Sequence, residues 1–350
     1  MKTILFLNPV GCVGGAEVSL VELISHLDAD RFRAVAAVPP GGPLRTALAD
    51  RGVATITVPE IRLRRSRNPL SLSRQWWRIT RAWRGTVRYV TGNDVDLLHA
   101  NGHAAQLVAG SAGRACRVPV IWHCRDLVRL EAFAPWMAAR ATRIVAISNT
   151  VRRHLESQHV PSEKLVTVYN GIDTSRLTVE HDAQTVRTKL DIPPAAPVVG
   201  MMAHFVPWKR HDLFLQAAIR ILDAAPGAHF VLPGTDLFGE HRDHVRRLRA
   251  MAAAPPLAGR VHFPGFQSHV ADVLAACDVV LHPASGEPFG RAVAESMFLS
   301  RPVVAVADGG PSELIRHGES GLLAPPGDAA AMARAVNVLL ADPERAADIG

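Results

Sequence analysis

The stretch DVVLHPASGEPFGRAVAES, residues 278–296, decides the fold. It begins with the apolar run DVVLHPA, which is typical of a buried strand, and it ends in an amphipathic helical pattern. Pro288 disfavours helical geometry in the residue before it and suits the first turn of a helix. We therefore expect a strand, a loop that holds Glu287 at the strand end, and a helix.

The same succession of strand and helix runs along the whole chain, which predicts parallel sheets covered by helices on both faces. A polar, Pro-bounded stretch at 171–197 interrupts it and reads as a link with a short helix. We therefore expect an α/β protein with two Rossmann-like domains, residues 1–171 and 172–350. The expected strands lie within residues 3–9, 32–42, 52–60, 96–101, 119–126, 142–148, 165–173, 197–205, 229–236, 261–266, 278–284 and 302–310.

The composition agrees with this class. The 350 residues are 48% hydrophobic and only 5% aromatic, so the cores are built mostly from Ala, Val and Leu. No stretch approaches the ~18 apolar residues of a membrane-spanning helix, and the N-terminal apolar run is too short for a secretory signal. We expect a cytoplasmic protein, at most peripheral at the inner face of the membrane. The four cysteines have no metal-binding spacing and are expected to be reduced thiols.

The net charge of +7 is concentrated in residues 62–88, which hold nine arginines and no acid. Trp76, Trp77 and Trp83 lie inside this segment. One interpretation is an Arg-rich surface helix with its tryptophans packed inward. The other is contact with an anionic membrane surface. Nucleic acid would also suit a basic face, but we expect none as a partner.

Glu287 and Glu295 flank a candidate anion site. The backbone N–H groups of Phe289, Gly290 and Arg291 lie at the expected helix start, where they have no intrahelical partners. A sugar nucleotide has a sugar, a diphosphate and a ribose in that order, so Glu287 would hold the sugar and Glu295 the ribose diol. The alternative is two exposed glutamates that the helix dipole favours at this position.

Lys209 and Arg210 open a second helix, in the stretch AHFVPWKRHDLFLQAA (203–218). Cations at a helix N-terminus oppose its dipole, and a bound diphosphate would remove that conflict. Ordinary surface cations are the alternative.

Other strand ends carry weaker signals. Gly14 and Gly15 form a Gly-rich turn in GCVGGAE, which matches neither the dinucleotide fingerprint nor a P-loop. Gly309 and Gly310 follow a strand and allow close backbone approach, with Glu313 as a ligand or a first-turn acid, before a short helix and a Gly/Pro loop. His123 and Arg125 end the strand PVIWHC, where His123 acts on an acceptor or leaving group or is a structural hydrogen-bonder.

Taken together, these segments resemble the family 4 glycosyltransferases, retaining enzymes of GT-B fold, in which two Rossmann-like domains face each other across a cleft. The carrying motifs are GGAE, VIWHCRDL, VAISNTV, VYNGID, FVPWKRHD, VHFPGF, EPFGRAVAES, PVVAVADGGPSELI and GLLAPPGD. The resemblance spans nearly the whole chain and is densest between residues 261 and 328.

The resemblance implies a donor site in the second domain and an acceptor side in the first. Catalytic roles fall on Glu287, Lys209 and His123. Donor binding falls on His204, Arg210, Phe289, Gly290, Glu295, Gly14, Gly15 and Gly265, and the acceptor side on Arg125, Asp126 and Asn170. The substrate would be a nucleoside-diphosphate sugar of the UDP or GDP type, the acceptor a carbohydrate or lipid-linked molecule, and neither a cofactor nor a metal would be needed.

Three departures from the family pattern stand out. His204 replaces the arginine that usually lies five residues before the lysine, so either His204, charged by phosphate, or Arg210 would be the second diphosphate cation. Arg210 itself stands where the family usually has glycine. The chain stops at LLADPERAADIG, before the usual final helix that crosses back to the first domain.

Other functions remain open from the sequence. A sugar-nucleotide epimerase or hydrolase of related fold would act without an acceptor, and a non-catalytic scaffold with a degenerate donor site would not turn over at all. An NAD-linked dehydrogenase is disfavoured because no G-x-G-x-x-G follows a strand.

Overall fold

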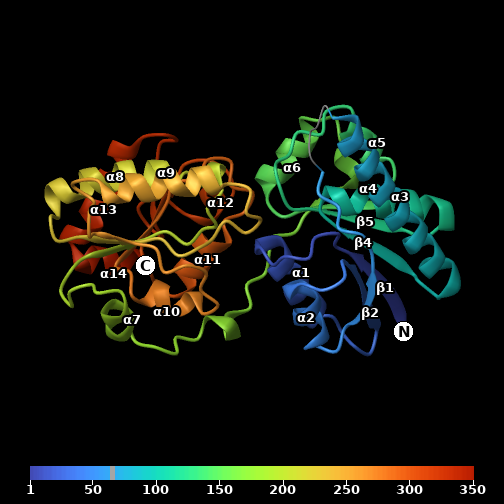
Figure 1. The fold of residues 1–350 in the computed structure, drawn as a ribbon, viewed down its shortest axis with the longest axis horizontal. Coiled ribbons are helices and arrows are strands. Elements are labelled where there is room, and N and C mark those ends of the chain that lie inside the picture. Colours follow the sequence, from blue (N-terminus) through green and yellow to red (C-terminus); the bar gives the residue numbers. More distant parts are fainter. Residues whose placement is uncertain (64–67) are drawn as a thin grey trace. The chain divides into compact units, whose positions relative to one another are not determined.

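The protein, in a computed structural model that describes residues 1–63 and 68–350, divides into two compact units, Met1–Gly171 and Ile172–Gly350. Each unit has its own sheet with helices on both faces (Figure 1). Every strand pairing among the described residues is parallel. Such sheets are buried on both faces, which is why their strands read as near-continuous apolar runs.

Unit 1 has a seven-stranded sheet in the order β3-β2-β1-β4-β5-β6-β7. Its strands are β1 (Lys2–Leu7), β2 (Phe32–Val38), β3 (Ala54–Thr57), β4 (Leu97–Asn101), β5 (Val120–Cys124), β6 (Arg143–Ala146) and β7 (Leu165–Thr167). Its helices are α1 (Gly15–Ser25), α2 (Pro43–Ala49), α3 (Pro69–Gly92), α4 (His103–Cys116), α5 (Phe133–Ala138) and α6 (Asn149–Glu156).

Side chains alternate across β1 and thereby build two cores in unit 1. Leu5 and Leu7 join the cluster under α3 and α4, whereas Ile4 and Phe6 join the cluster under α1 and α2. This period of two is the expected consequence of strand geometry. The same sheet therefore holds helices on both sides (Figure 1).

Unit 2 has a six-stranded sheet in the order β10-β9-β8-β11-β12-β13. Its strands are β8 (Val198–Gly200), β9 (His229–Val231), β10 (Val261–His262), β11 (Val279–His282), β12 (Val303–Val306) and β13 (Leu322–Ala324). Its helices are α7 (Ala183–Lys189), α8 (His211–Ala224), α9 (Arg242–Ala253), α10 (Val270–Ala275), α11 (Arg291–Phe298), α12 (Pro311–Leu314), α13 (Ala329–Ala341) and α14 (Pro343–Ile349).

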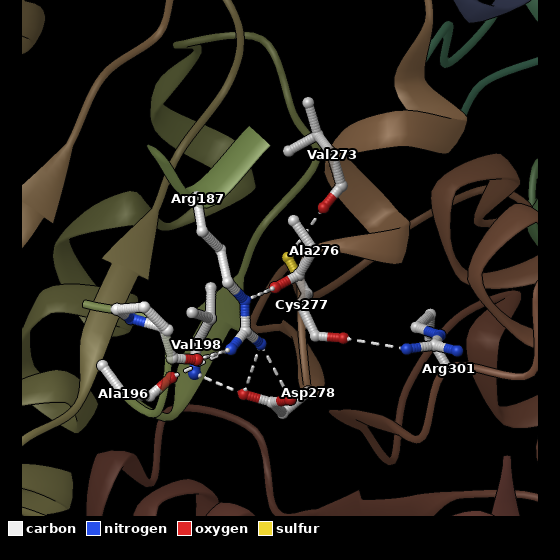
Figure 2. Close-up of polar contacts among 9 residues, drawn as sticks. Arg187, Ala196, Val198, Val273, Ala276, Cys277, Asp278 and Arg301 are labelled. Atoms are coloured by element: carbon white, nitrogen blue, oxygen red, sulfur yellow. Dashed lines mark hydrogen bonds and ion pairs between the residues drawn. The ribbon is translucent and has the colours of Figure 1, made fainter. Parts of the chain in front are cut away.

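Arg187 of α7 ties this helix to the start of the unit 2 sheet (Figure 2). Its guanidinium donates to both carboxylate oxygens of Asp278, at 2.9 and 3.0 Å, and to the carbonyls of Ala276 at 3.1 Å and Ala196 at 3.3 Å. Asp278 in turn accepts the N–H of Val198 at 2.7 Å. These bonds fix the beginnings of β8 and β11, the two strands whose other ends carry the candidate site.

All of the expected strands form. The expectation of a plain Gly/Pro loop after the Gly309–Gly310 helix was wrong, because residues 322–324 form β13 and pair with β12. Its three residues between Gly321 and Pro325 are too few to show a period. Of the basic segment 62–88, Arg64, Arg65 and Arg67 lie outside the described residues.

Candidate active site

The strand order places one switch point in each sheet. In unit 1, β1 lies beside β4, and in unit 2, β8 lies beside β11, with the strand order running outward on either side. Loops that leave neighbouring strands at such a point diverge and open a crevice beyond the carboxyl ends. The residues predicted for the site lie after β8, β10 and β11 in unit 2, and after β1 and β7 and at the end of β5 in unit 1.

Glu287 lies in the loop between β11 and α11, and its residue is 7% exposed. Its Oε2 pairs with Nζ of Lys209 and lies 3.1 Å from Nε2 of His282. Lys209 ends a short 3-10 turn after β8, and His282 ends β11. The structure thus brings together two residues predicted for the site, 78 positions apart, across the switch point of unit 2.

The carboxylate of Glu287 is held in its charged form. Burial by itself raises the pKa of this carboxyl, but the charge of Lys209 and the hydrogen bonds from His282 and Lys209 outweigh burial and lower the pKa to about 2. A buried carboxylate with a cation on one oxygen is a fixed negative charge at neutral pH.

The helix after Glu287 begins later than the sequence suggests. Pro288 does not lie in the first turn of α11, because Gly290 adopts φ +96° and the helix starts at Arg291. This left-handed turn is open to glycine and strained for other residues. Phe289 is buried, so its backbone is the part of this residue that a ligand at the helix start can reach.

Gly309 and Gly310 make room for the Glu287 loop. A Cβ on Gly309 would lie 2.5 Å from the carbonyl oxygen of Glu287, and one on Gly310 would lie 2.4 Å from that of Phe289. The N–H of Gly310 donates to the Glu287 carbonyl at 2.7 Å. The close approach that these glycines permit is therefore to the loop that carries Glu287.

Glu295 lies in the second turn of α11 and pairs with Arg291 at 3.0 Å, with both side chains 14% exposed. Its carboxylate is thus near the helix start and already positioned by an i,i+4 partner. The predicted role in holding a ribose stays a prediction.

His204 and Arg210 have different surroundings. Burial, together with the nearby charge of Lys209, lowers the pKa of His204, and its ring stacks parallel to that of Phe266. Arg210 is half-exposed and pairs with Asp212 at 3.1 Å. His204 therefore starts neutral and Arg210 starts with a carboxylate partner, and either would have to change to bind a diphosphate.

Gly265 adopts φ +79°, and its carbonyl accepts the N–H of Gly234 at 2.8 Å. This bond ties the loops after β9 and β10 together. Gly234 itself has no room for a Cβ, which would lie 2.0 Å from the carbonyl oxygen of Ala203, in the loop after β8.

Arg125 is the centre of the strand-end group in unit 1, and it is 7% exposed. Its guanidinium donates to the side-chain oxygen of Asn101. It also donates to the side-chain oxygen of Asn170, at 2.9 Å. Asn101 donates in turn to Asn8 at 2.7 Å, across the switch point between β1 and β4. The amide oxygens orient the guanidinium.

His123 lies beside Arg125, with its Nδ1 3.3 Å from Arg125 Nη2 and 3.1 Å from His99 Nε2. Since the guanidinium can only donate, Nδ1 accepts and the ring proton lies on Nε2. Burial, reinforced by Arg125, lowers the pKa of His123 well below its usual value. His123 is therefore neutral, its Nε2 is buried without a hydrogen-bond partner in the described part of the chain, and its catalytic role stays a prediction.

Gly14 and Gly15 lead into α1, with Gly14 as N-cap. The Glu17 carboxylate accepts the Gly14 N–H at 3.0 Å. Burial raises the pKa of Glu17. Asp126 turns away from the Arg125 group and pairs with His103 at 2.9 Å.

Sequence reasoning missed His282, Asp308, Asn8 and Asn101. Asp308 accepts the N–H of Gly286 at 2.9 Å and so supports the Glu287 loop. All four stand at the end of an apolar run, and this shared position was the available signal. What was missing was the strand order, which decides which ends are neighbours.

Comparison with known proteins covers nearly the whole chain. The family models "Glycosyltransferase Family 4" and "Glycosyl transferases group 1" match residues 13–176 and 182–350. The 2-deoxystreptamine N-acetyl-D-glucosaminyltransferase of Streptomyces fradiae is 29% identical over 95% of this chain and 84% of its own length. The lipopolysaccharide core biosynthesis glycosyltransferase LpsE of Rhizobium meliloti (strain 1021) is 38% identical, over 45% of this chain and only 43% of its own length.

Among solved structures, Anabaena HepE in complex with UDP-glucose superposes with a TM-score of 0.86 at 28% identity, covering 100% of this chain and 92% of HepE. This likeness confirms the expected fold class, GT-B with two Rossmann-like domains.

Proposed function

The chain belongs to the family 4 glycosyltransferases, and on that premise we propose that it moves a sugar from a uridine diphosphate sugar to a carbohydrate or lipid-linked acceptor. Transfer proceeds with retention of anomeric configuration and without a metal ion. UDP is chosen over GDP because HepE was solved with UDP and with UDP-glucose.

The observation that carries the proposal is the buried Glu287–Lys209 pair at the switch point of unit 2. A buried ion pair adds little stability by itself, because desolvation offsets its attraction. Here Glu287 lies just before the start of α11, where the first backbone N–H groups of a helix have no intrahelical partner. Lys209 and these N–H groups would stabilise the negative charge that develops on the leaving diphosphate.

Titration calorimetry of the full chain with UDP, GDP and ADP tests the donor site. We expect UDP to bind most tightly. Equal or no binding of all three would contradict the assigned donor and favour a degenerate site.

Incubation with UDP-glucose, with and without an oligosaccharide acceptor, tests the reaction. Sugar appearing on the acceptor with an unchanged anomeric configuration by NMR supports retaining transfer. Turnover of the donor without an acceptor would instead indicate a hydrolase or epimerase, and an inverted product would overturn retention. Activity that survives EDTA supports metal independence.

Helix α3 supports a peripheral contact with the cytoplasmic membrane surface as part of this proposal. The fully buried residues of α3 begin at Ala82 and Ile79 before them packs partly against the core, whereas most residues of the first two turns are exposed. Trp76 is 67% exposed and Trp77 58%, which contradicts the interpretation that these two pack inward, whereas Trp83 does pack on the core. Five arginines of α3 are exposed: Arg74, Arg78, Arg81, Arg84 and Arg88.

An amphipathic helix with aromatic and cationic residues fits the interface of an anionic bilayer. No helix of the described chain has the length and hydropathy to cross a membrane. Co-sedimentation with phosphatidylglycerol vesicles should exceed that with phosphatidylcholine vesicles and should weaken with salt. Trp76→Ser with Trp77→Ser should abolish it, whereas the control Phe298→Ser, an exposed aromatic of unit 2, should not. Equal sedimentation of all variants would contradict this contact.

A further inference from the structure

Three side chains with metal-binding atoms meet on the side of β5 that faces away from Arg125. They are His103, Cys124 and Asp126, and one ligand atom from each lies within 4.8 Å of the others. His103 Nε2 is 2.9 Å from the Asp126 carboxylate, and the Cys124 thiol lies 3.6 Å from the Asp126 carbonyl oxygen. Neither Cys124 nor His103 takes part in the transfer proposed above.

Local geometry fixes these three residues. Gly102 adopts φ +87°, and its N–H donates to the His123 carbonyl at 2.9 Å, so the first residue of α4 is held against the end of β5. Along this strand end the side chains alternate in direction. His123 contacts Arg125, which donates to Asn101, whereas the Asp126 carboxylate pairs with His103 and the Cys124 thiol has its ligand atom within 4.8 Å of both. The guanidinium is thereby directed away from the cluster.

One ring nitrogen of His103 lacks a hydrogen-bond partner in the described part of the chain. Its side chain is 11% exposed, and its Nδ1 is buried without a hydrogen-bond partner. A neutral imidazole has one donor and one acceptor nitrogen, so the pair with Asp126 satisfies only half of the ring. Buried polar atoms of this kind call for an explanation such as an ion.

We propose that His103, Cys124 and Asp126 bind one zinc-class divalent cation, with a fourth position open to water. Nitrogen and sulfur ligands select zinc-class metals over Mg²⁺ or Ca²⁺. With bonds of about 2.0–2.3 Å, tetrahedral ligand atoms lie about 3.3–3.8 Å apart, so the cluster has to contract by about 1 Å. Asp126, whose side chain is 40% exposed, can supply that movement and gives the ion a route from solvent.

The cluster shares no residue with the Glu287–Lys209 pair on which the proposed donor site rests. It is a binding site rather than a reactive thiol, because Cys124 is 1% exposed and so is shielded from reagents in solution. Metal binding would displace the thiol proton and would commit the Asp126 carboxylate to the ion.

Cobalt(II) titration of the full chain, followed by absorption spectroscopy, tests this site without using enzymatic activity. We expect a thiolate-to-cobalt charge-transfer band at one equivalent, which Zn²⁺ then removes by competition. Cys124→Ser should abolish the band, and His103→Gln should weaken Co²⁺ binding at least tenfold. Cys116→Ser is the matched control, since Cys116 is a half-buried thiol at the other end of α4, and it should keep the band.

Absence of a charge-transfer band in the unsubstituted chain would overturn the site, and so would a band that persists in Cys124→Ser. Circular dichroism checks that each variant is folded. If Cys124→Ser is not folded, the His103→Gln titration decides, because unchanged Co²⁺ affinity in that variant also overturns the site. Neither result depends on whether the chain transfers sugar.

Discussion

The two groups of side chains at the strand ends, around Glu287 in unit 2 and around Arg125 in unit 1, stabilise buried charge in opposite ways. In unit 2 a buried carboxylate, Glu287, is neutralised by a cation, Lys209. In unit 1 a buried cation, Arg125, is oriented by the amide oxygens of Asn101 and Asn170 and by a neutral His123. A ligand anion can compete with Glu287 for Lys209, whereas Arg125 is held by two amide oxygens and its charge also acts on the Glu17 carboxylate. Lys209 in unit 2 is thus an exchangeable charge, because a ligand can replace its carboxylate partner. Arg125 in unit 1 is a positioned charge, because surrounding groups fix its direction.

Lys209→Met should have the largest effect, because it removes the exchangeable cation. We expect kcat/KM to fall by ~10³, the loss of about 4 kcal/mol seen when one donor to a developing anion is removed. UDP affinity should fall as well. The exposed Lys189→Met is the matched control and should leave both unchanged. Unchanged activity in Lys209→Met would remove Lys209 from the reaction.

Acid unfolding distinguishes the two groups by their pH windows. The folded pKa of Glu287, about 2, is depressed from 4.5, so its contribution to stability is present above pH 4.5 and is lost as the pH falls toward 2. The contribution is roughly 3 kcal/mol. Glu287→Gln should therefore show a smaller drop in the free energy of unfolding between pH 5 and pH 3, measured with urea.

The unit 1 counterpart is His99, whose pKa burial lowers from 6.5 to about 3. Its contribution is present above pH 6.5 and is lost as the pH falls toward 3, a window that opens two units earlier. His99→Gln should reduce the pH dependence between 6.5 and 5, where Glu287→Gln has no effect, and the other histidines with lowered pKa, such as His123 and His211, account for the remainder. The same pH profile for both variants would contradict the assigned windows.

Arg125→Gln tests the positioned charge. We expect transfer to slow ~10–100-fold, since a misdirected group next to a reaction costs of this order. The affinity for UDP alone should not change, because the proposed donor site lies in unit 2. Arg129→Gln, an exposed arginine nearby, is the control. Weaker UDP binding in Arg125→Gln would contradict the assignment of UDP binding to unit 2.

The smallest effect is expected at Arg210, which adopts φ +60° where the family usually has glycine. Arg210→Gly should stabilise the chain by ~1 kcal/mol by removing left-handed strain, and the exposed pair with Asp212 offsets little of this. Arg117→Gly in unit 1, at φ +58°, should raise Tm similarly. If Arg210 is the second diphosphate cation, only Arg210→Gly weakens UDP binding, measured by calorimetry.

The sequence predicted the strand and helix succession well, because short apolar runs between Gly and Pro signals leave few alternatives. It also proposed Glu287 and Lys209 for the site, because each follows such a run, and their roles stay predictions. It could not show that Lys209 contacts Glu287 rather than solvent, nor that His282 and Asp308 support the loop, because these contacts depend on the order β8-β11-β12. Alternation along a strand predicts which face of the sheet a residue lies on, but it does not predict which strand lies beside it.

The same limit explains why the sequence did not predict the partner of Asp126 or the exposure of the tryptophans at the start of α3. The acceptor-side role of Asp126 and Arg125 stays a prediction, but the sequence did not show that the two side chains have different partners, His103 and Asn101. Trp76 and Trp77 lie on a helix whose buried face starts only later, and helical periodicity alone does not show where packing begins.

The single crossing of the chain at Gly171–Ile172 has a thermodynamic consequence. Each unit has its own sheet and its own core, and so each is a cooperative folding unit. In a chain whose units unfold independently, a ligand stabilises the unit that it occupies, by about 2.7 kcal/mol at a hundredfold excess over Kd. Hydrogen exchange of the UDP-saturated chain should therefore slow among the deepest amides of residues 172–350 and not among those of residues 1–171, so that linkage alone maps where the nucleotide sits.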